Sequence, residues 1–151
     1  MINYSEDKYG VECLNLAHNC KSDMRFGAVL VLDDEIIGRG WNRLSTAEER
    51  SILTHVDYAT HAEQGAIIDA LQKGKDISGG KIYVLGYAKK SRELSTRNGK
   101  FFTCRKCPHS MIRFNLSVFI PHPIAGWQQL SGEEALDSAK EHKGYWKNFC
   151  K

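Results

Sequence analysis

The chain has 151 residues, of which 42% are hydrophobic and 26% are charged, so it can build one globular domain with a buried core. Its formal net charge of +3 is too small to imply nucleic-acid binding by itself. Five cysteines in a chain without an export signal argue against a disulfide framework and favour metal binding or buried thiols. We therefore expect a single domain over residues 1–151.

The first twenty residues, MINYSEDKYGVECLNLAHNC, include acidic side chains and no continuous apolar run. This composition does not fit a secretory signal or a transit peptide. No segment approaches the roughly 20 apolar residues that are needed to cross a bilayer. We expect a cytoplasmic protein that does not bind a membrane.

Apolar periodicity and turn residues predict alternating strands and helices along the chain. In order, they are a helix over residues 8–19, two strands within 26–41 joined at Asp33-Asp34, a helix over 61–73, a strand over 81–88, a return strand at 101–104 after an Asn98-Gly99 turn, a short helix at about 106–115, a strand over 116–120 and a closing helix from Ser131 to Trp146. Pro121 and Pro123 are expected to end the strand pattern. Strands separated by helices indicate an α/β architecture, a mixed sheet covered by helices.

The segment YATHAEQGAIIDAL, residues 58–71, carries an apolar stripe at the three-to-four-residue spacing of a helix face. This stripe has no need of His61 or Glu63. One interpretation is structural, because Thr60 could cap the helix and Glu63, three residues later, would complete a capping box. The rest of the chain has to decide whether these two residues have a chemical role.

A second pattern, FFTCRKCPHSM, places Cys104 and Cys107 three residues apart at the expected strand-to-helix junction. Two thiolates at this spacing can bind one ion from a single turn. The motif alone also fits a redox pair or half of a zinc knuckle, but neither uses a histidine at the start of an earlier helix. A zinc ion bound by His61, Cys104 and Cys107 would use it and would keep its fourth tetrahedral position open for water.

A zinc ion with an open position lowers the pKa of its water from about 15.7 towards 7, and the reaction then needs a group that moves protons. Glu63 follows His61 by two residues, which is about 200° around an ideal helix, so the two side chains cannot share one face. We therefore expect the ion to lie beyond the N-terminus of the helix, with His61 and Glu63 approaching it from different sides.

With these residues in place, HAE followed by CRKC resembles the zinc signature of the cytidine and deoxycytidylate deaminase superfamily. The segments SDMRFGAVLVLDDEIIGRGWN and AEERSILTHVDYATHAEQGAI are similar to the first strand pair of deoxycytidylate deaminases and to the approach to their histidine. The resemblance covers roughly residues 10–120 and implies a three-layer fold around a mixed sheet of about five strands.

The resemblance implies hydrolytic deamination of a cytosine nucleotide, dCMP above all, in a zinc-dependent homo-oligomer, with Glu63 as the proton shuttle. Asn42 matches the family residue that hydrogen-bonds a sugar hydroxyl, and the backbone of Ala62 would contact the pyrimidine edge. Arg25 matches a stretch that contacts phosphate in nucleotide-using members, although a plain surface arginine is the alternative. Gly65 stands where an asparagine is common.

Several alternatives stay open. Residues 87–106 hold seven basic side chains and one acidic residue, which favours phosphate contact or a solvated hairpin face. Editing of single-stranded DNA or tRNA is the alternative function, and a binding module without catalysis is a third class, against which the complete His-Glu-Cys-Cys set argues. Cys13, His18 and Cys20 could bind a second metal, but buried thiols are the simpler interpretation. Trp127 is expected to pack the closing helix onto the sheet.

Overall fold

The computed structural model describes residues 3–53, 59–92, 94, 107–122 and 124–141. Its helices are α1 (Lys8–Ala17), α2 (Ala47–Ile52), α3 (Ala62–Gln72), α4 (Cys107–Arg113) and α5 (Gly132–Glu141). Its strands are β1 (Met24–Leu32), β2 (Glu35–Trp41), β3 (Arg43–Leu44), β4 (Ala59–Thr60), β5 (Lys81–Ala88), β6 (Ser117–His122) and β7 (Gly126–Ser131). The expected alternation of helices and strands is confirmed, and the Asn98-Gly99 turn with its return strand lies outside the described residues.

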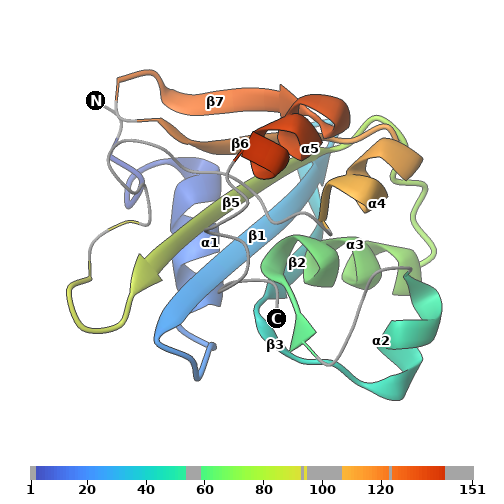
Figure 1. Ribbon diagram of the computed structural model, residues 1–151, viewed down its shortest axis with the longest axis horizontal. Coiled ribbons are helices and arrows are strands. Elements are labelled where there is room, and N and C mark those ends of the chain that lie inside the picture. Colours follow the sequence, from blue (N-terminus) through green and yellow to red (C-terminus); the bar gives the residue numbers. More distant parts are fainter. Residues whose placement is uncertain (1–2, 54–58, 93, 95–106, 123, 142–151) are drawn as a thin grey trace.

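Five strands form one mixed sheet in the order β2-β1-β5-β6-β7, and β3 and β4 pair separately (Figure 1). Neighbouring strands of the large sheet are antiparallel except for β5 and β6, which are parallel. The β1–β2 hairpin turns at Asp33 and Asp34, whose φ values of 52° and 61° lie in the left-handed region that such tight turns require. The mixed five-stranded α/β sheet predicted from the sequence is therefore confirmed.

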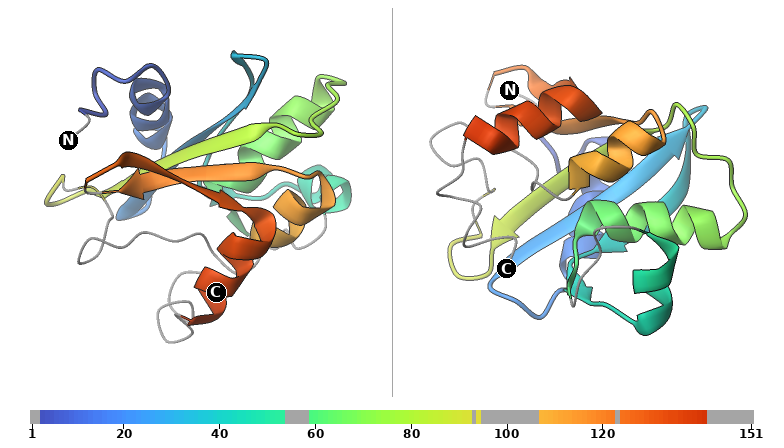
Figure 2. Two further views of the ribbon diagram at one scale, coloured as in Figure 1. Left: turned by 90° about the horizontal axis from the view of Figure 1, so that it is seen from above. Right: turned by 45° about the vertical axis from the view of Figure 1, so that its right-hand side comes forward.

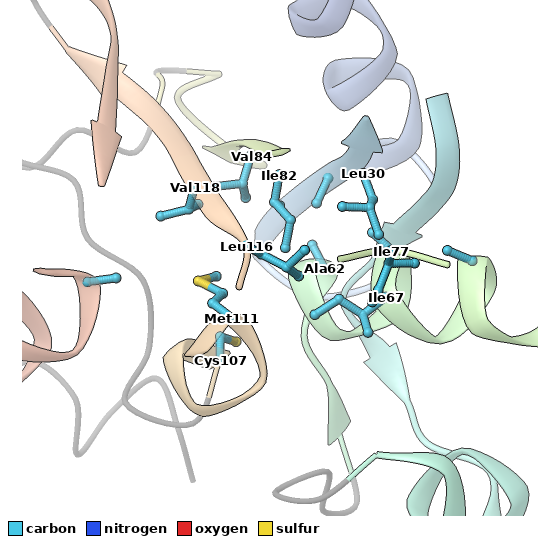
Figure 3. Packing of buried hydrophobic residues seen from close by; sticks show 14 of the residues in the cluster. Leu30, Ala62, Ile67, Ile77, Ile82, Val84, Cys107, Met111, Leu116 and Val118 are labelled. Atoms are coloured by element: carbon cyan, nitrogen blue, oxygen red, sulfur yellow. The ribbon is translucent and has the colours of Figure 1, made fainter. Parts of the chain in front are cut away.

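The sheet separates two helical layers (Figures 1 and 2). Side chains along β1 alternate between them: Ala28 and Leu30 join the core beneath α3, α4 and α5, whereas Val29 and Val31 join the core beneath α1. Figure 3 shows the first of these cores, in which Cys107 and Met111 of α4 lie close to the strands and to the start of α3. This layer brings α3 and α4 together.

Glycines let both layers approach the sheet closely. A Cβ on Gly40 of β2 would stand 2.3 Å from the backbone nitrogen of Ala66, and one on Gly27 of β1 would stand 1.9 Å from the carbonyl oxygen of Cys13. Neither distance is tolerated by a real side chain, so α3 and α1 rest directly on strand backbone. Gly40 thereby sets the position of the first turn of α3.

The free edge of the sheet at β2 is partly covered by α3. The backbone N–H of Arg39 donates to Oδ2 of Asp69, at 2.9 Å, and the same oxygen accepts from Nζ of Lys73 at 2.9 Å. The carboxylate of Asp69 therefore accepts a hydrogen bond from an edge-strand N–H that would otherwise be directed away from the sheet.

The end of the sheet differs from the sequence prediction in two ways. Strand β6 does not stop at Pro121 but pairs through it to His122, and β7 follows. Within the described residues, pairing of β5 with β6 ends at Phe119, so Pro121 lies in a part of β6 that pairs with β7 alone.

Trp127 of β7 also differs from its prediction. Its ring packs edge-on against Tyr4 and Tyr83 in the core beneath α1, and its Nε1–H donates to Oδ2 of Asp7 at 3.3 Å. It therefore lies on the face of the sheet opposite to α5. The capping box of α5 is confirmed, since Ser131 and Glu134 exchange side-chain to backbone hydrogen bonds. None of the described helices is both long and apolar enough to cross a bilayer.

Candidate active site

The start of α3 corrects the predicted helix cap. The N-cap is His61, with φ −76° and ψ 159°, and not Thr60. The residue that reaches back is Gln64, whose Oε1 accepts the N–H of His61 at 3.0 Å, so Glu63 is not the capping residue. The hydroxyl of Thr60 instead lies 2.8 Å from the hydroxyl of Ser45. The structural interpretation of Glu63 is therefore wrong, because another side chain does that work.

His61 and Cys107 come from different helices and meet at one point. The Nδ1 atom of His61 lies 3.4 Å from Sγ of Cys107 although 46 residues separate them in the chain. His61 has extended backbone geometry, so its side chain leaves the helix at its N-terminus, where the first residue of α4 lies. Pro108 falls in the first turn of α4, where its missing N–H has no helical partner in any case.

Glu63 is a buried carboxyl group next to this pair. Its side chain belongs to the first turn of α3, and only 7% of the residue is exposed. Burial raises the pKa of the Glu63 carboxyl, and hydrogen bonds from its own backbone and from Cys107 act in the opposite direction. A carboxyl group with a raised pKa in a buried site is suited to exchange protons near neutral pH.

The donor set around this point suits a zinc ion. An imidazole nitrogen and a thiol sulfur in contact are ligand types that zinc prefers, and the carboxyl of Glu63 lies beside Cys107. Ser110, one turn after Cys107, has a buried hydroxyl without a hydrogen-bond partner in the described part of the chain. Cys104, the third predicted ligand, lies outside the described residues.

The predicted substrate contacts lie at the same end of the sheet. Asn42 follows β2, Arg25 lies near the start of β1, and Ala62 opens α3. Ala62 is almost fully buried, so its backbone and not its side chain is the group that can meet a ligand. The guanidinium of Arg25 donates from Nε to the carbonyl of Ser22 at 3.2 Å and is half-buried.

The Asn42 side chain holds the turn before β1. Its Oδ1 accepts from the N–H of Phe26 at 2.7 Å and from the thiol of Cys20 at 2.8 Å. Its Nδ2 donates to Oγ of Ser22 at 2.9 Å and to the carbonyl of Met24 at 3.1 Å. All four polar positions of the amide are therefore engaged within the protein, a structural role that the sequence did not reveal.

Gly65 stands where the family often has asparagine, and the structure supplies a reason. A Cβ at this position would lie 3.2 Å from Cα of Gly40, so α3 and β2 are already in close contact there. A longer side chain would force the helix and the strand apart.

Three other predicted candidates do not assemble into a metal site. The thiol of Cys13 donates to the carbonyl of Tyr83, and burial raises its pKa. The Nδ1 atom of His18 pairs with the hydroxyl of Tyr87 at 2.7 Å, and Cys20 is bonded to Asn42. Among the described residues, no group of three metal-binding side chains is close enough to bind an ion. Cys13 and Cys20 are buried thiols, as the simpler interpretation held.

Fold and site together define an α/β enzyme with a His-Glu-Cys centre at the start of one helix. The profile of the cytidine and deoxycytidylate deaminase zinc-binding region matches residues 4–121. This chain belongs to that family and is a zinc-dependent hydrolytic deaminase. By sequence alone, no curated protein matches it.

Solved structures agree on the fold. The dCMP deaminase of cyanophage S-TIM5 is 18% identical with a TM-score of 0.56, and the match covers 92% of this chain and 94% of that one. The cytidine deaminase of Burkholderia pseudomallei is 19% identical with a TM-score of 0.57, and the match covers 83% of this chain and 91% of that one. At these identities the likeness establishes the shared fold and leaves the substrate open.

Proposed function

We propose that this protein deaminates a small cytosine nucleotide, dCMP, to the corresponding uracil nucleotide and ammonia, with water as the other reactant. The observation that carries the proposal is the buried carboxyl of Glu63 beside the contact between His61 and Cys107. A crystal structure of the cyanophage dCMP deaminase holds dCMP and dUMP, which supports this choice of nucleotide.

In this proposal, His61, Cys104 and Cys107 hold the zinc ion, which when bound supplies the Lewis acidity that activates water at neutral pH. Glu63 takes one proton from the attacking water and gives it to the ring nitrogen, then takes the second proton from the hydroxyl on the attacked carbon and gives it to the amine, which leaves as ammonia. Burial of Glu63 keeps its proton affinity high, so that it can act as acid and base in one cycle.

Substrate binding is assigned to the end of the sheet where β1 begins and β2 ends. The backbone of Ala62 contacts the pyrimidine edge, and Arg25 contacts the phosphate. Asn42 contacts a sugar hydroxyl by exchanging one of its four present hydrogen bonds, such as the one from Nδ2 to Oγ of Ser22, so the 20–26 turn and the sugar position are linked. We also propose that the enzyme is a cytoplasmic homo-oligomer formed from a single domain.

A second candidate function is the editing of cytosine or adenine in single-stranded DNA or tRNA. The observation in its favour is that Lys89, Lys90 and Arg92 are exposed after β5, with the N–H of Lys89 bonded to the carbonyl of Asp23 near Arg25. A strand-binding groove would use such cations, but the net charge of +3 gives them little long-range support.

The test compares deamination of dCMP, deoxycytidine, single-stranded DNA and a tRNA mixture. Ammonia release is measured for each at low and at moderate salt. We expect dCMP to react fastest with a shallow salt dependence, because only one phosphate is bound. An oligonucleotide that reacts far faster than dCMP, and loses that advantage as salt rises, would identify an editing enzyme instead.

A further inference from the structure

Before His61, the chain passes through a cluster of polar contacts, centred on the buried Glu49 and Thr60, that the reaction does not use. Helix α2 is only six residues long, and a helix of this length is not stable by itself. It begins with a capping box in which Oγ1 of Thr46 accepts the N–H of Glu49 at 3.2 Å and Oε1 of Glu49 accepts the N–H of Thr46 at 2.9 Å. The sequence contains this signature, T-A-E-E, although no helix was predicted there.

Glu49 also ties α2 to strand β3. Both terminal nitrogens of Arg43 donate to the two carboxylate oxygens of Glu49, the NH1 contact being 2.6 Å long. Only 7% of the Glu49 side chain is exposed, and the hydrogen bonds from Arg43 are the largest cause of the lowered pKa of its carboxyl. A two-point contact of this kind fixes orientation as well as distance.

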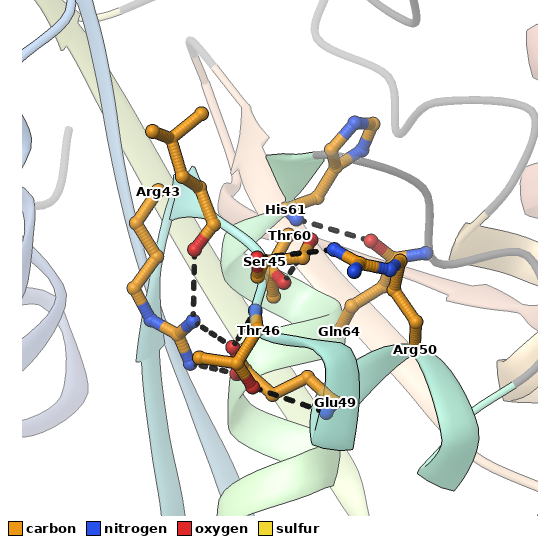
Figure 4. Close-up of polar contacts among 9 residues, drawn as sticks. Arg43, Ser45, Thr46, Glu49, Arg50, Thr60, His61 and Gln64 are labelled. Carbon is orange, nitrogen blue, oxygen red and sulfur yellow. Dashed lines mark hydrogen bonds and ion pairs between the residues drawn. The ribbon is translucent and has the colours of Figure 1, made fainter.

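Strand β3 in turn holds strand β4. Arg43 pairs with Thr60 in the two-stranded ladder, and the hydroxyls of Ser45 and Thr60 lie 2.8 Å apart. Arg50 of α2 donates to the carbonyl of Ser45 at 3.2 Å, so Ser45 is also hydrogen-bonded to the helix. Figure 4 shows the two sets of contacts, one from Arg43 through Glu49 to Thr46 and the other from Arg50 through Ser45 to Thr60, next to the backbone of His61.

These contacts end at Thr60, the residue that precedes His61. Thr60 is fully buried, and the backbone leaves it in extended geometry at His61 before α3 begins. The direction of the His61 side chain therefore depends on two fixed backbones, that of α3 on one side and that of β4 on the other. Gln64 secures the first through the N–H of His61.

We propose that Arg43, Ser45, Glu49 and Thr60, together called the β4 brace, are positioning residues that orient His61 for zinc binding. This inference rests on the proposed role of His61 as a zinc ligand. Groups that orient a metal ligand commonly change metal affinity about 10-fold to 100-fold when they are removed. A brace with only a structural role would change stability and leave zinc affinity unaltered.

The main test replaces Thr60 by valine, which keeps the shape of the side chain and removes the hydroxyl that contacts Ser45. We expect the zinc dissociation constant, measured by competition with a chromophoric chelator, to rise about tenfold. Thr60→Ser should restore it. The matched control is Asp7→Ala, which removes the cap of α1 on the opposite face of the sheet and should lower the melting temperature without changing zinc affinity.

Ser45→Ala removes the same hydrogen bond by replacing Ser45, the half-buried partner of Thr60. This variant is the test if Thr60→Val does not fold. The same loss of zinc affinity is expected. Zinc affinities within twofold of wild type in both variants, with melting temperatures lowered as in Asp7→Ala, would overturn the brace. His61→Ala separates the brace from the proposed function. Stoichiometric zinc in that variant would overturn the proposed function. Loss of zinc in that variant, together with unchanged zinc affinity in Ser45→Ala, would overturn the brace alone.

Discussion

Helices α1 and α3 lie on opposite faces of the sheet and are built on similar terms. Each rests on bare strand backbone, at Gly27 for α1 and at Gly40 for α3. Their N-caps differ. Asp7 caps α1 with a carboxylate that accepts the N–H of Gly10 at 2.8 Å, which is the usual work of a cap residue.

The cap of α3 is a histidine, a residue that is not favoured at this position. Its ring reaches Cys107 on another helix, and Gln64 completes a capping box by accepting the N–H of His61. Glu63, two residues after His61, is buried in the first turn of α3, whereas the first turn of α1 has no acidic residue. The difference teaches that a helix start can combine capping with chemistry, because Gln64 reaches back to His61 and leaves Glu63 without a capping role.

The largest expected effect breaks this comparison at Glu63. We expect Glu63→Gln to bind zinc and to remain folded but to lose about 10²-fold to 10⁴-fold in kcat, because the side chain can no longer exchange protons. Ammonia release and metal analysis measure the two quantities. The control is Asp7→Ala, which should lose stability and keep its kcat. A Glu63→Gln variant with wild-type turnover would contradict the assignment.

The second prediction uses the two glycine contacts. Gly40→Ala and Gly27→Ala each force backbone apart and should lower the free energy of unfolding by about 1–3 kcal/mol, measured in urea. Only Gly40→Ala should also weaken zinc binding, because the inserted methyl group displaces the first turn of α3. Equal effects of the two variants on zinc affinity would show that the position of α3 is not critical.

The third prediction concerns the cap of α1 itself. Asp7→Ala should lower the free energy of unfolding by about 1 kcal/mol, because the N–H of Gly10 loses its acceptor. Asp7→Asn should fall by less, since an asparagine oxygen can still cap. Thermal or urea unfolding distinguishes the two. If both variants were as stable as wild type, the cap would contribute nothing measurable.

The smallest effect is a pH dependence. Hydrogen bonds from Arg43 lower the pKa of Glu49 below the 4.5 of a free carboxyl, so its contribution to stability is present above pH 4.5 and is lost as the pH falls through the lower folded value. The free energy of unfolding should therefore fall less steeply in Glu49→Gln than in wild type below pH 4.5. Parallel curves through that range would contradict the ion pair.

The sequence predicted the parts of the fold in which local pattern and final structure agree. The Asp33-Asp34 hairpin, the apolar stripe of α3 and the capping box of α5 each arise from interactions within a few residues. The proximity of His61 and Cys107 was also predictable, because few kinds of site other than a metal centre combine a histidine with a cysteine pair.

The remaining features depend on contacts far apart in the chain. Thr60 and His61 are each followed, three residues later, by a side chain that could complete a capping box. The hydroxyl of Thr60 pairs instead with Ser45, fifteen residues away in the chain, and His61 is the N-cap. Strand β7 buries Gly126 and Leu130 and exposes the two glutamines between, so it lacks the alternation that marks a strand. Helix α2 is too short to show a period.

The contact between Asp69 and the N–H of Arg39 bears on how this protein behaves at high concentration. An open edge strand is a template on which another chain can add a strand, and such addition is the usual route to ribbon-like aggregates. At β2 an approaching chain would first have to displace a carboxylate that is also held by Lys73. Addition of a strand at this border would therefore break the hydrogen bonds of Asp69 before it gained its own.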